Sequence, residues 1–222
     1  MTRLFRTVAA SAAVLVLSSC AGESSEEPAE TPSVSTSPSP SSTVNVPASV
    51  ELTEVGAALS FGDSATVIYE PTQKRGSVLE VTVKNAKQGS TKDFTGFILD
   101  DYTKKATPYY VDVTVENVGE SNVGGVAVPV WGVDQTNTLL PPATFTTTFR
   151  RCPSEQLPKK FGSGESFSTC LVFFAPDKGT LKAVSFRPNQ EFDPIEWTGK
   201  IATPEPEPKK KSKKQGKKKN NG

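Results

Sequence analysis

Cysteine is the residue type whose chemistry is easiest to interpret in this chain, because its 222 residues include three cysteines and no histidine. The absence of histidine removes the commonest general base, the usual zinc ligand and the standard serine and cysteine triads. Cys152 and Cys170 lie in the central part of the chain, and Cys20 lies near its start. An odd number of cysteines leaves one thiol to be explained outside a disulfide.

Cys20 closes the run LSSC (17–20), which follows a ten-residue apolar stretch, 8–17, and a start that carries Arg3 and Arg6. This stretch is too short for a membrane span, which needs about 20 apolar residues, and is typical of a signal peptide. The run resembles a bacterial lipobox, in which the Cys thiol accepts a diacylglyceryl group. We therefore predict a signal peptide over 1–19, acyl chains such as palmitate on Cys20, and a location in the cell envelope, at the outer face of the cytoplasmic membrane. The alternative is an ordinary secretory signal with an incidental Cys.

With Cys20 assigned to lipidation, Cys152 and Cys170 remain as a pair. Outside the cytoplasm such a pair is usually a disulfide, and closing a loop of this length contributes roughly 3 kcal/mol in the chain-entropy model. Two thiols alone make a poor zinc site. We predict a disulfide, no metal and no cofactor.

Carboxylate chemistry stays open, because a glycosidase needs only two acids about 5 to 9.5 Å apart. The candidates are Asp100 with Asp101, and the group Glu191, Asp193 and Glu196. Adjacent strand residues point to opposite faces, so Asp100 and Asp101 would pair only in a loop. In a loop we expect them to be solvated charges, and a calcium site is the less favoured interpretation. No nucleophile or P-loop motif occurs. We predict no catalytic residue, with a carboxylate hydrolase as the alternative.

Aromatic residues are a further means of binding, because their rings stack on sugars or on a partner's side chains. The candidates are Tyr102, Tyr109, Tyr110, Trp131 and Trp197, most of which we expect in the core or at strand edges. Tyr110 shares a strand face with Asp112, Thr114 and Glu116, so we expect it to be exposed. Tyr110, Asp100 and Asp101 are therefore the predicted ligand-binding residues.

Composition divides the chain into four parts. After the signal peptide, Cys20 and the stretch 21–48 form a linker with eight Ser and five Pro, which we expect to be disordered. Its reach is roughly 30 Å as a coil and up to about 90 Å if extended. Residues 49–202 hold the apolar residues of one domain, and 203–222 form a disordered tail. The linker has a net charge of −4, the domain is near −3 and the tail is +6.

The tail contains eight lysines and no Arg or aromatic residue. Such a tail binds anions in a non-specific and salt-dependent way, or only keeps the protein soluble. The predicted anion-binding residues are Lys209, Lys210, Lys211, Lys213, Lys214, Lys217, Lys218 and Lys219. The possible partners are anionic lipid, cell-wall polymer or an envelope protein, and export argues against nucleic acid.

Alternation of apolar and polar residues over 79–84 and 109–116 predicts half-buried strands. The stretch 167–174 is apolar on both faces, as in a central strand, and weaker patterns cover 65–70, 126–133, 144–149, 181–186 and 195–200. Gly and Pro turns separate these runs, and no sustained helical period occurs. We predict an all-β fold: an immunoglobulin-like antiparallel β-sandwich of seven to nine strands.

The pieces GDSA (62–65), VTVENVG (113–119) and GESFSTCLVF (164–173) resemble the telokin-like, immunoglobulin-fold domains of secreted proteins and lipoproteins of Gram-positive bacteria, especially actinobacteria. The resemblance spans roughly 60–200. It implies a sandwich of unknown function and supplies no functional residues. The cysteine pair and a long loop, 93–108, are additions to this pattern.

These observations favour a lipid-anchored, non-enzymatic binding or accessory module of the bacterial envelope. Loops on a rigid sandwich are ordinary binding sites, although a fold alone does not establish a function. The alternatives are an envelope hydrolase with paired carboxylates, and an envelope-organising protein that binds anionic polymers through its tail.

Overall fold

The computed structural model describes residues 44–204. The predicted signal peptide, Cys20, the linker up to residue 43 and the eight tail lysines lie outside the described residues. Residues 44–48, which the composition assigns to the linker, lie against the domain, where the Asn45 side chain donates a hydrogen bond of 3.1 Å to Glu120. Across 44–204, no helix is long and apolar enough to cross a membrane.

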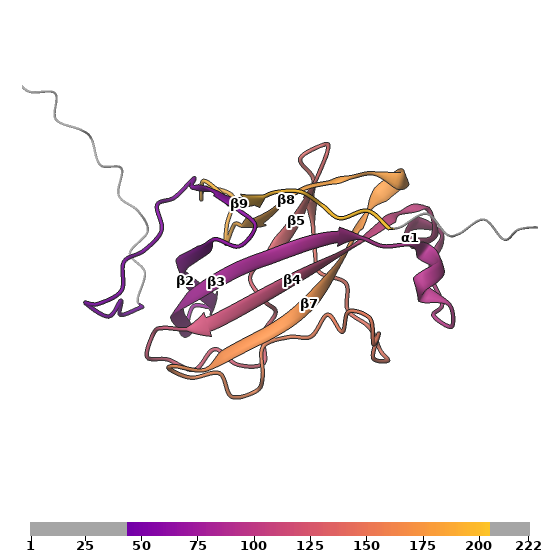
Figure 1. The fold of residues 1–222 in the computed structure, drawn as a ribbon. Helices are drawn as coiled ribbons and strands as arrows, with labels where there is room; N and C mark the ends of the chain where they lie inside the picture. The colour runs from indigo at the N-terminus through magenta and orange to yellow at the C-terminus, as the bar shows by residue number, and fades with distance from the viewer. Residues whose placement is uncertain (1–43, 205–222) are drawn as a thin grey trace, which may run out of the picture. The chain divides into compact units, whose positions relative to one another are not determined.

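Two sheets form the described domain (Figure 1). The first has the strand order β2-β3-β4-β7, and the second has the order β1-β9-β8-β5-β6. The strands are β1 (Ala58–Ser60), β2 (Ser64–Thr72), β3 (Arg75–Gln88), β4 (Thr107–Asn117), β5 (Trp131–Asp134), β6 (Leu139–Leu140), β7 (Ser166–Ala175), β8 (Leu181–Phe186) and β9 (Ile195–Thr198). Neighbouring strands are antiparallel, except that β1 runs parallel to β9. The predicted all-β sandwich is thereby confirmed.

The core lies between the sheets because each long strand turns alternate side chains inward. Val81 and Val83 of β3 and Val111 and Val113 of β4 are buried there. Burying a side chain of this size contributes about 1.5 to 3 kcal/mol. Trp197 of the second sheet is fully buried, and its indole N–H donates a hydrogen bond of 2.9 Å to the Asp63 carbonyl.

Most of the predicted strands are present, but the stretch 144–149 is not a strand. Phe145 and Phe149 of this stretch pack in an aromatic cluster. Their spacing resembles that of a strand, although the stretch pairs with no neighbouring strand. The stretch 126–133 becomes a strand only from Trp131 onward. The short strands β1 and β6 carry too few residues to show a period of two.

In agreement with the lack of a sustained helical period in the sequence, the loops of the described domain contain only short helices. Short helical segments are η1 (Thr91–Phe94), α1 (Asp101–Lys105) and η2 (Pro176–Lys178). Each is too short to show a helical period, although Ser90 and Asp93 form a capping box at η1. The long loop 93–108 therefore contains local structure.

β7 is an edge strand of its sheet, although its apolar pattern predicts a central one. The segment after β6 covers the open edge: the Ala143 N–H donates to the Val172 carbonyl (2.7 Å), and the Ser154 N–H donates to the Cys170 carbonyl (2.8 Å). The strand is apolar on both faces because a second cluster of side chains covers its outer face.

Candidate functional site

Cys152 and Cys170 form the predicted disulfide, with their Cα atoms 4.9 Å apart. The bond ties β7 to the loop that precedes it, as the sequence indicates. Two residues after Cys152, the Ser154 hydroxyl donates to the Ala143 carbonyl (2.6 Å) and accepts from the Val172 N–H (3.3 Å). The disulfide therefore holds the loop against the edge of β7.

The disulfide lies in a second apolar cluster on the outer face of the first sheet, which we call the outer cluster. Its buried members are Phe94, Tyr110, Phe149, Cys152 and Val172. The rings of Phe94 and Phe149 stack with their centroids 4.5 Å apart, and that of Phe174 lies 5.2 Å from Phe94. Phe94 and Phe149 come from segments outside the sheet, so the outer cluster fixes these segments to its surface.

Tyr110 is buried, with 6% of its surface exposed, and the expectation that it is an exposed ligand-binding residue is wrong in that respect. Its side chain does lie on the predicted face, but the outer cluster covers this part of the face. The hydroxyl donates to Oδ2 of Asp93 (2.9 Å). Burial, followed by the hydrogen bond to Asp93 and its charge, raises the pKa of Tyr110.

Asp100 and Asp101 have separate local roles. Asp100 is the N-cap of α1, and its Oδ1 accepts a hydrogen bond of 2.7 Å from the Thr103 N–H, which lowers the pKa of the Asp100 carboxyl. Asp101 pairs with Lys104 (2.9 Å) on the same helix, at an exposed position. Both carboxylates make local contacts at the start of α1, and their role in ligand binding stays a prediction.

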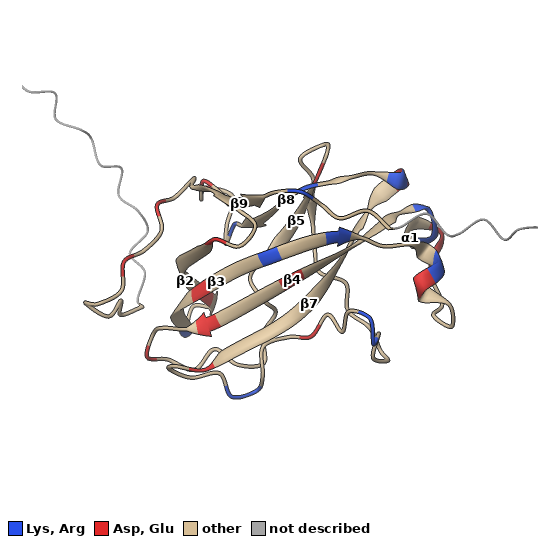
Figure 2. Cartoon of the chain, in the orientation of Figure 1, with Lys and Arg blue, Asp and Glu red and all other residues tan. Residues whose placement is uncertain are grey.

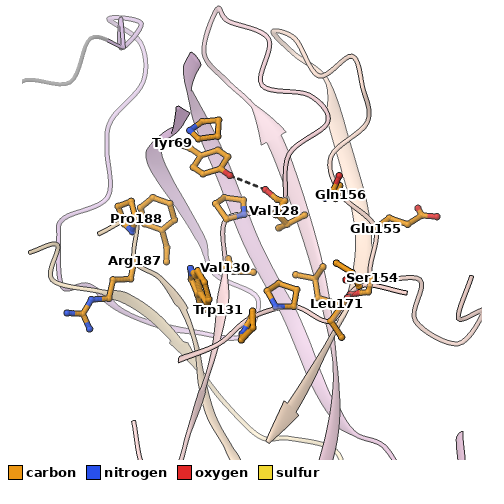
Figure 3. Close-up of a pocket in the computed structure, with 18 of the residues that line it drawn as sticks. Tyr69, Val128, Val130, Trp131, Ser154, Glu155, Gln156, Leu171, Arg187 and Pro188 are labelled. Atoms are coloured by element: carbon orange, nitrogen blue, oxygen red, sulfur yellow. Dashed lines mark hydrogen bonds between the residues drawn. The ribbon is translucent and has the colours of Figure 1, made fainter. Parts of the chain in front are cut away.

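A groove of about 410 Å³ opens between the two sheets (Figure 3). Tyr69 and Leu171 line it from the first sheet, and Trp131 and Phe186 line it from the second. Five prolines add to its apolar walls: Pro71, Pro129, Pro141, Pro142 and Pro188. A preformed apolar groove of this size is the usual setting for a ligand site.

Trp131 is the tryptophan that a ligand can reach, with 37% of its surface exposed, whereas Trp197 has none. Figure 3 shows Trp131 and Val130 on one side of the groove and Leu171 and Ser154 on the other. At one end, the Tyr69 hydroxyl donates to the Ala127 carbonyl (3.2 Å), which fixes its ring. Burial raises the pKa of Tyr69, against the charge of Arg75, so the hydroxyl stays protonated.

Two carboxylates, Glu70 and Glu155, line the groove from different elements. Figure 3 shows Glu155 directed away from the groove. None of Glu191, Asp193 and Glu196 lines it. Within the described residues, no group of three or more acidic or cysteine side chains is placed to hold a metal ion. Apolar side chains and prolines make up most of the walls of this groove.

A second pocket, of about 590 Å³, lies where β3 ends. Lys87, Lys92 and Arg151 line it, together with Asp93 and the hydroxyl end of Tyr110. Arg151 pairs with Asp93 (3.4 Å). Basic side chains outnumber the carboxylate here, so we call this the cationic pocket.

Sequence reasoning found Trp131 but not its surroundings. Tyr69 and the five prolines come from four separate segments, and only Pro141-Pro142 stands out, as a turn signal. Arg151 lies far from Lys87 and Lys92 along the chain, and folding alone brings it to them.

The comparisons with known proteins add little to these observations. No family model matches this chain, so membership of the telokin-like family stays a prediction. No curated protein matches it either. Among solved structures, this chain is similar to that of MPT63, a secreted protein from Mycobacterium tuberculosis, with a TM-score of 0.45 and 12% sequence identity, over 66% of this chain and 100% of that one.

Proposed function

We propose that this chain is a lipid-anchored, non-enzymatic binding module at the outer face of the cell membrane, and that the groove around Trp131 binds its ligand. The exposed Trp131 ring in an apolar groove is the observation that carries the proposal. Both sheets hold the groove, so little conformational entropy is lost when a ligand enters. The signal-like start and Cys20 support the location.

The groove suits a ligand with a flat apolar face. An indole ring provides a large contact area, and the prolines around it are rigid. A sugar ring of the wall or a proline-containing segment of an envelope protein presents such a face. The carboxylate of Glu70 adds a polar group to the groove wall.

Tryptophan fluorescence tests this proposal directly, because Trp197 is fully buried and Trp131 is exposed. The mature chain is titrated with soluble peptidoglycan fragments and, separately, with an oligoproline peptide. We expect one of these probes to shift the emission, and the shift to be absent in Trp131→Phe. By calorimetry, Trp131→Ala should weaken binding about 30-fold, the effect of removing a central aromatic contact.

Tyr102→Ala is the matched control, because Tyr102 is an exposed aromatic residue outside the groove. Its affinity should equal that of the unmodified chain. Equal affinity of Trp131→Ala and the unmodified chain, or no binding of either probe, would refute the groove as the ligand site.

A further inference from the structure

Charge is unevenly distributed over the described domain (Figure 2). Residues 84–105 and 150–151 contain seven Lys and Arg against three Asp, a net charge of +4. The remaining described residues contain eight Lys and Arg against fifteen Asp and Glu, a net charge of −7. A domain with a net charge of −3 thus has a basic region around the end of β3.

The cationic pocket is the centre of this basic region. Arg151 keeps 56% of its side chain exposed although it pairs with Asp93, and Lys87 and Lys92 are also exposed. The chain turns over the Tyr110 ring at Gly89, where an added Cβ would come within 2.5 Å of the ring. Glycine therefore allows the segment with Lys92 to pass close to the Tyr110 ring of β4 and to meet Lys87 and Arg151 at one pocket.

The C-terminal segment reaches the same place. The Gln88 N–H donates to the Ala202 carbonyl (2.8 Å), and the Ala202 N–H donates to the Ala86 carbonyl (3.0 Å). Pro204 lines the cationic pocket. The residues that follow in the sequence include the eight lysines of the tail, so the tail is attached at this pocket.

The linker joins the domain at the other end of β3. Val44, the first described residue, lies next to Gly76, where an added Cβ would clash with it. Arg75, the first residue of β3, donates to the Gly124 carbonyl (2.6 Å), and Lys159 lies beside Gly124. β3 has 14 residues and so separates its two ends by roughly 40 Å.

We propose that the cationic pocket and the basic region around it are a second binding surface, and that its partner is a phosphate-bearing polymer of the cell wall. Arg and Lys are the side chains that bind phosphate groups. The choice of a wall polymer over the membrane rests on the proposed lipid anchor, because the described chain begins at Val44, at the opposite end of β3 from this surface. The acidic remainder of the domain directs a polyanion to this end.

The test uses long-chain inorganic polyphosphate as the probe and the full mature chain with the eight tail lysines changed to Gln. In this background, Lys87→Gln with Lys92→Gln is compared with Lys159→Gln with Lys160→Gln. Both pairs remove two exposed lysines and leave the same net charge. We expect the first pair to weaken binding at least tenfold more than the second, and to lower the slope of log affinity against log salt by about one to two.

Equal effects of the two lysine pairs on polyphosphate binding would overturn the proposal. It would also be overturned if Lys87 and Lys92 were needed for binding to anionic phosphatidylglycerol vesicles but not for binding to polyphosphate. Arg151→Lys keeps the charge but loses the planar guanidinium, and should weaken polyphosphate binding less than the lysine pair does. Unfolding curves of each variant check that the domain is intact. The Trp131 fluorescence titration with the groove probes is run in parallel. A groove that binds no probe would leave the binding of polyphosphate to this surface unaffected, so failures of the two proposals can be told apart.

Discussion

The Tyr110 hydroxyl donates a hydrogen bond of 2.9 Å to Oδ2 of Asp93, and this contact joins the outer cluster to the cationic pocket. The same carboxylate accepts the Ser90 N–H (3.0 Å) and pairs with Arg151 (3.4 Å). The ring of Tyr110 packs against Phe149. A buried aromatic residue thus positions the carboxylate that holds Arg151 at the pocket.

We expect Tyr110→Phe to lower the free energy of unfolding by about 1 kcal/mol, because the ring stays packed while one hydrogen bond to Asp93 is lost. Urea unfolding monitored by circular dichroism measures the change. Tyr102→Phe, at an exposed position, serves as the control and should have no effect. A Tyr110→Phe domain as stable as the unmodified one would show that the contact contributes nothing.

Replacing both Cys152 and Cys170 by Ser should lower the free energy of unfolding by about 2 to 4 kcal/mol. The loop with Ser154 should then leave the edge of β7 and loosen one wall of the groove. Urea unfolding gives the stability, and the Trp131 fluorescence titration gives the effect on the groove. Two free thiols titrated in the native, unmodified domain would contradict the disulfide.

Asp134 gives the domain a predictable dependence on pH. It is the buried last residue of β5 and accepts from the Thr136 hydroxyl (2.7 Å) and from the N–H groups of Thr136 (2.7 Å) and Thr138 (2.9 Å). Burial acts to raise the pKa of Asp134, but these hydrogen bonds outweigh it and hold the pKa below its ordinary value of 3.8. The contact therefore adds stability above pH 3.8, which is lost as the pH falls through the folded pKa.

Asp134→Asn should accordingly lower the free energy of unfolding by about 1 kcal/mol at pH 7, and the difference from the unmodified chain should narrow in acid. Unfolding curves between pH 7 and pH 2.5 measure this. Asp193→Asn, at an exposed position, should show no such trend. A constant difference across this range would rule out the carboxylate as its cause.

Cys20 should carry a diacylglyceryl group and be the first residue of the mature protein, because it follows a ten-residue apolar stretch at lipobox spacing. Mass spectrometry of the native protein, extracted from membranes with detergent, identifies the modified N-terminal peptide. Cys20→Ser should release the protein from the membrane fraction. A membrane-free mature form that starts at another residue would exclude lipidation.

The purified mature chain should not hydrolyse wall polymers, because the sequence lacks His and nucleophile motifs and Cys152 and Cys170 are bridged. Release of reducing sugar from peptidoglycan is the measurement. Turnover that is lost in Glu70→Gln with Glu155→Gln, the carboxylates of the groove, would instead support the hydrolase. Turnover that is lost in Asp100→Asn or Asp101→Asn would support a hydrolase that uses the carboxylates at α1.

Much of the fold could be predicted because it depends on local patterns. The period of two over 109–116 placed Val111 and Val113 inside, and the parity of the cysteines paired Cys152 with Cys170. The same period put Tyr110 on the correct face but not at the correct exposure. Segments around 94 and 149 in the sequence cover that face, and no local pattern records such a contact.

The sequence by itself determined the sandwich, the disulfide and the segregation of charge, because periodicity, cysteine count and composition can be read residue by residue. Only the tertiary structure decided that Tyr69 and Trp131 share a groove and that Lys87, Lys92 and Arg151 share a pocket. These groups lie far apart along the chain, and their distances depend on strand order and on how the two sheets pack.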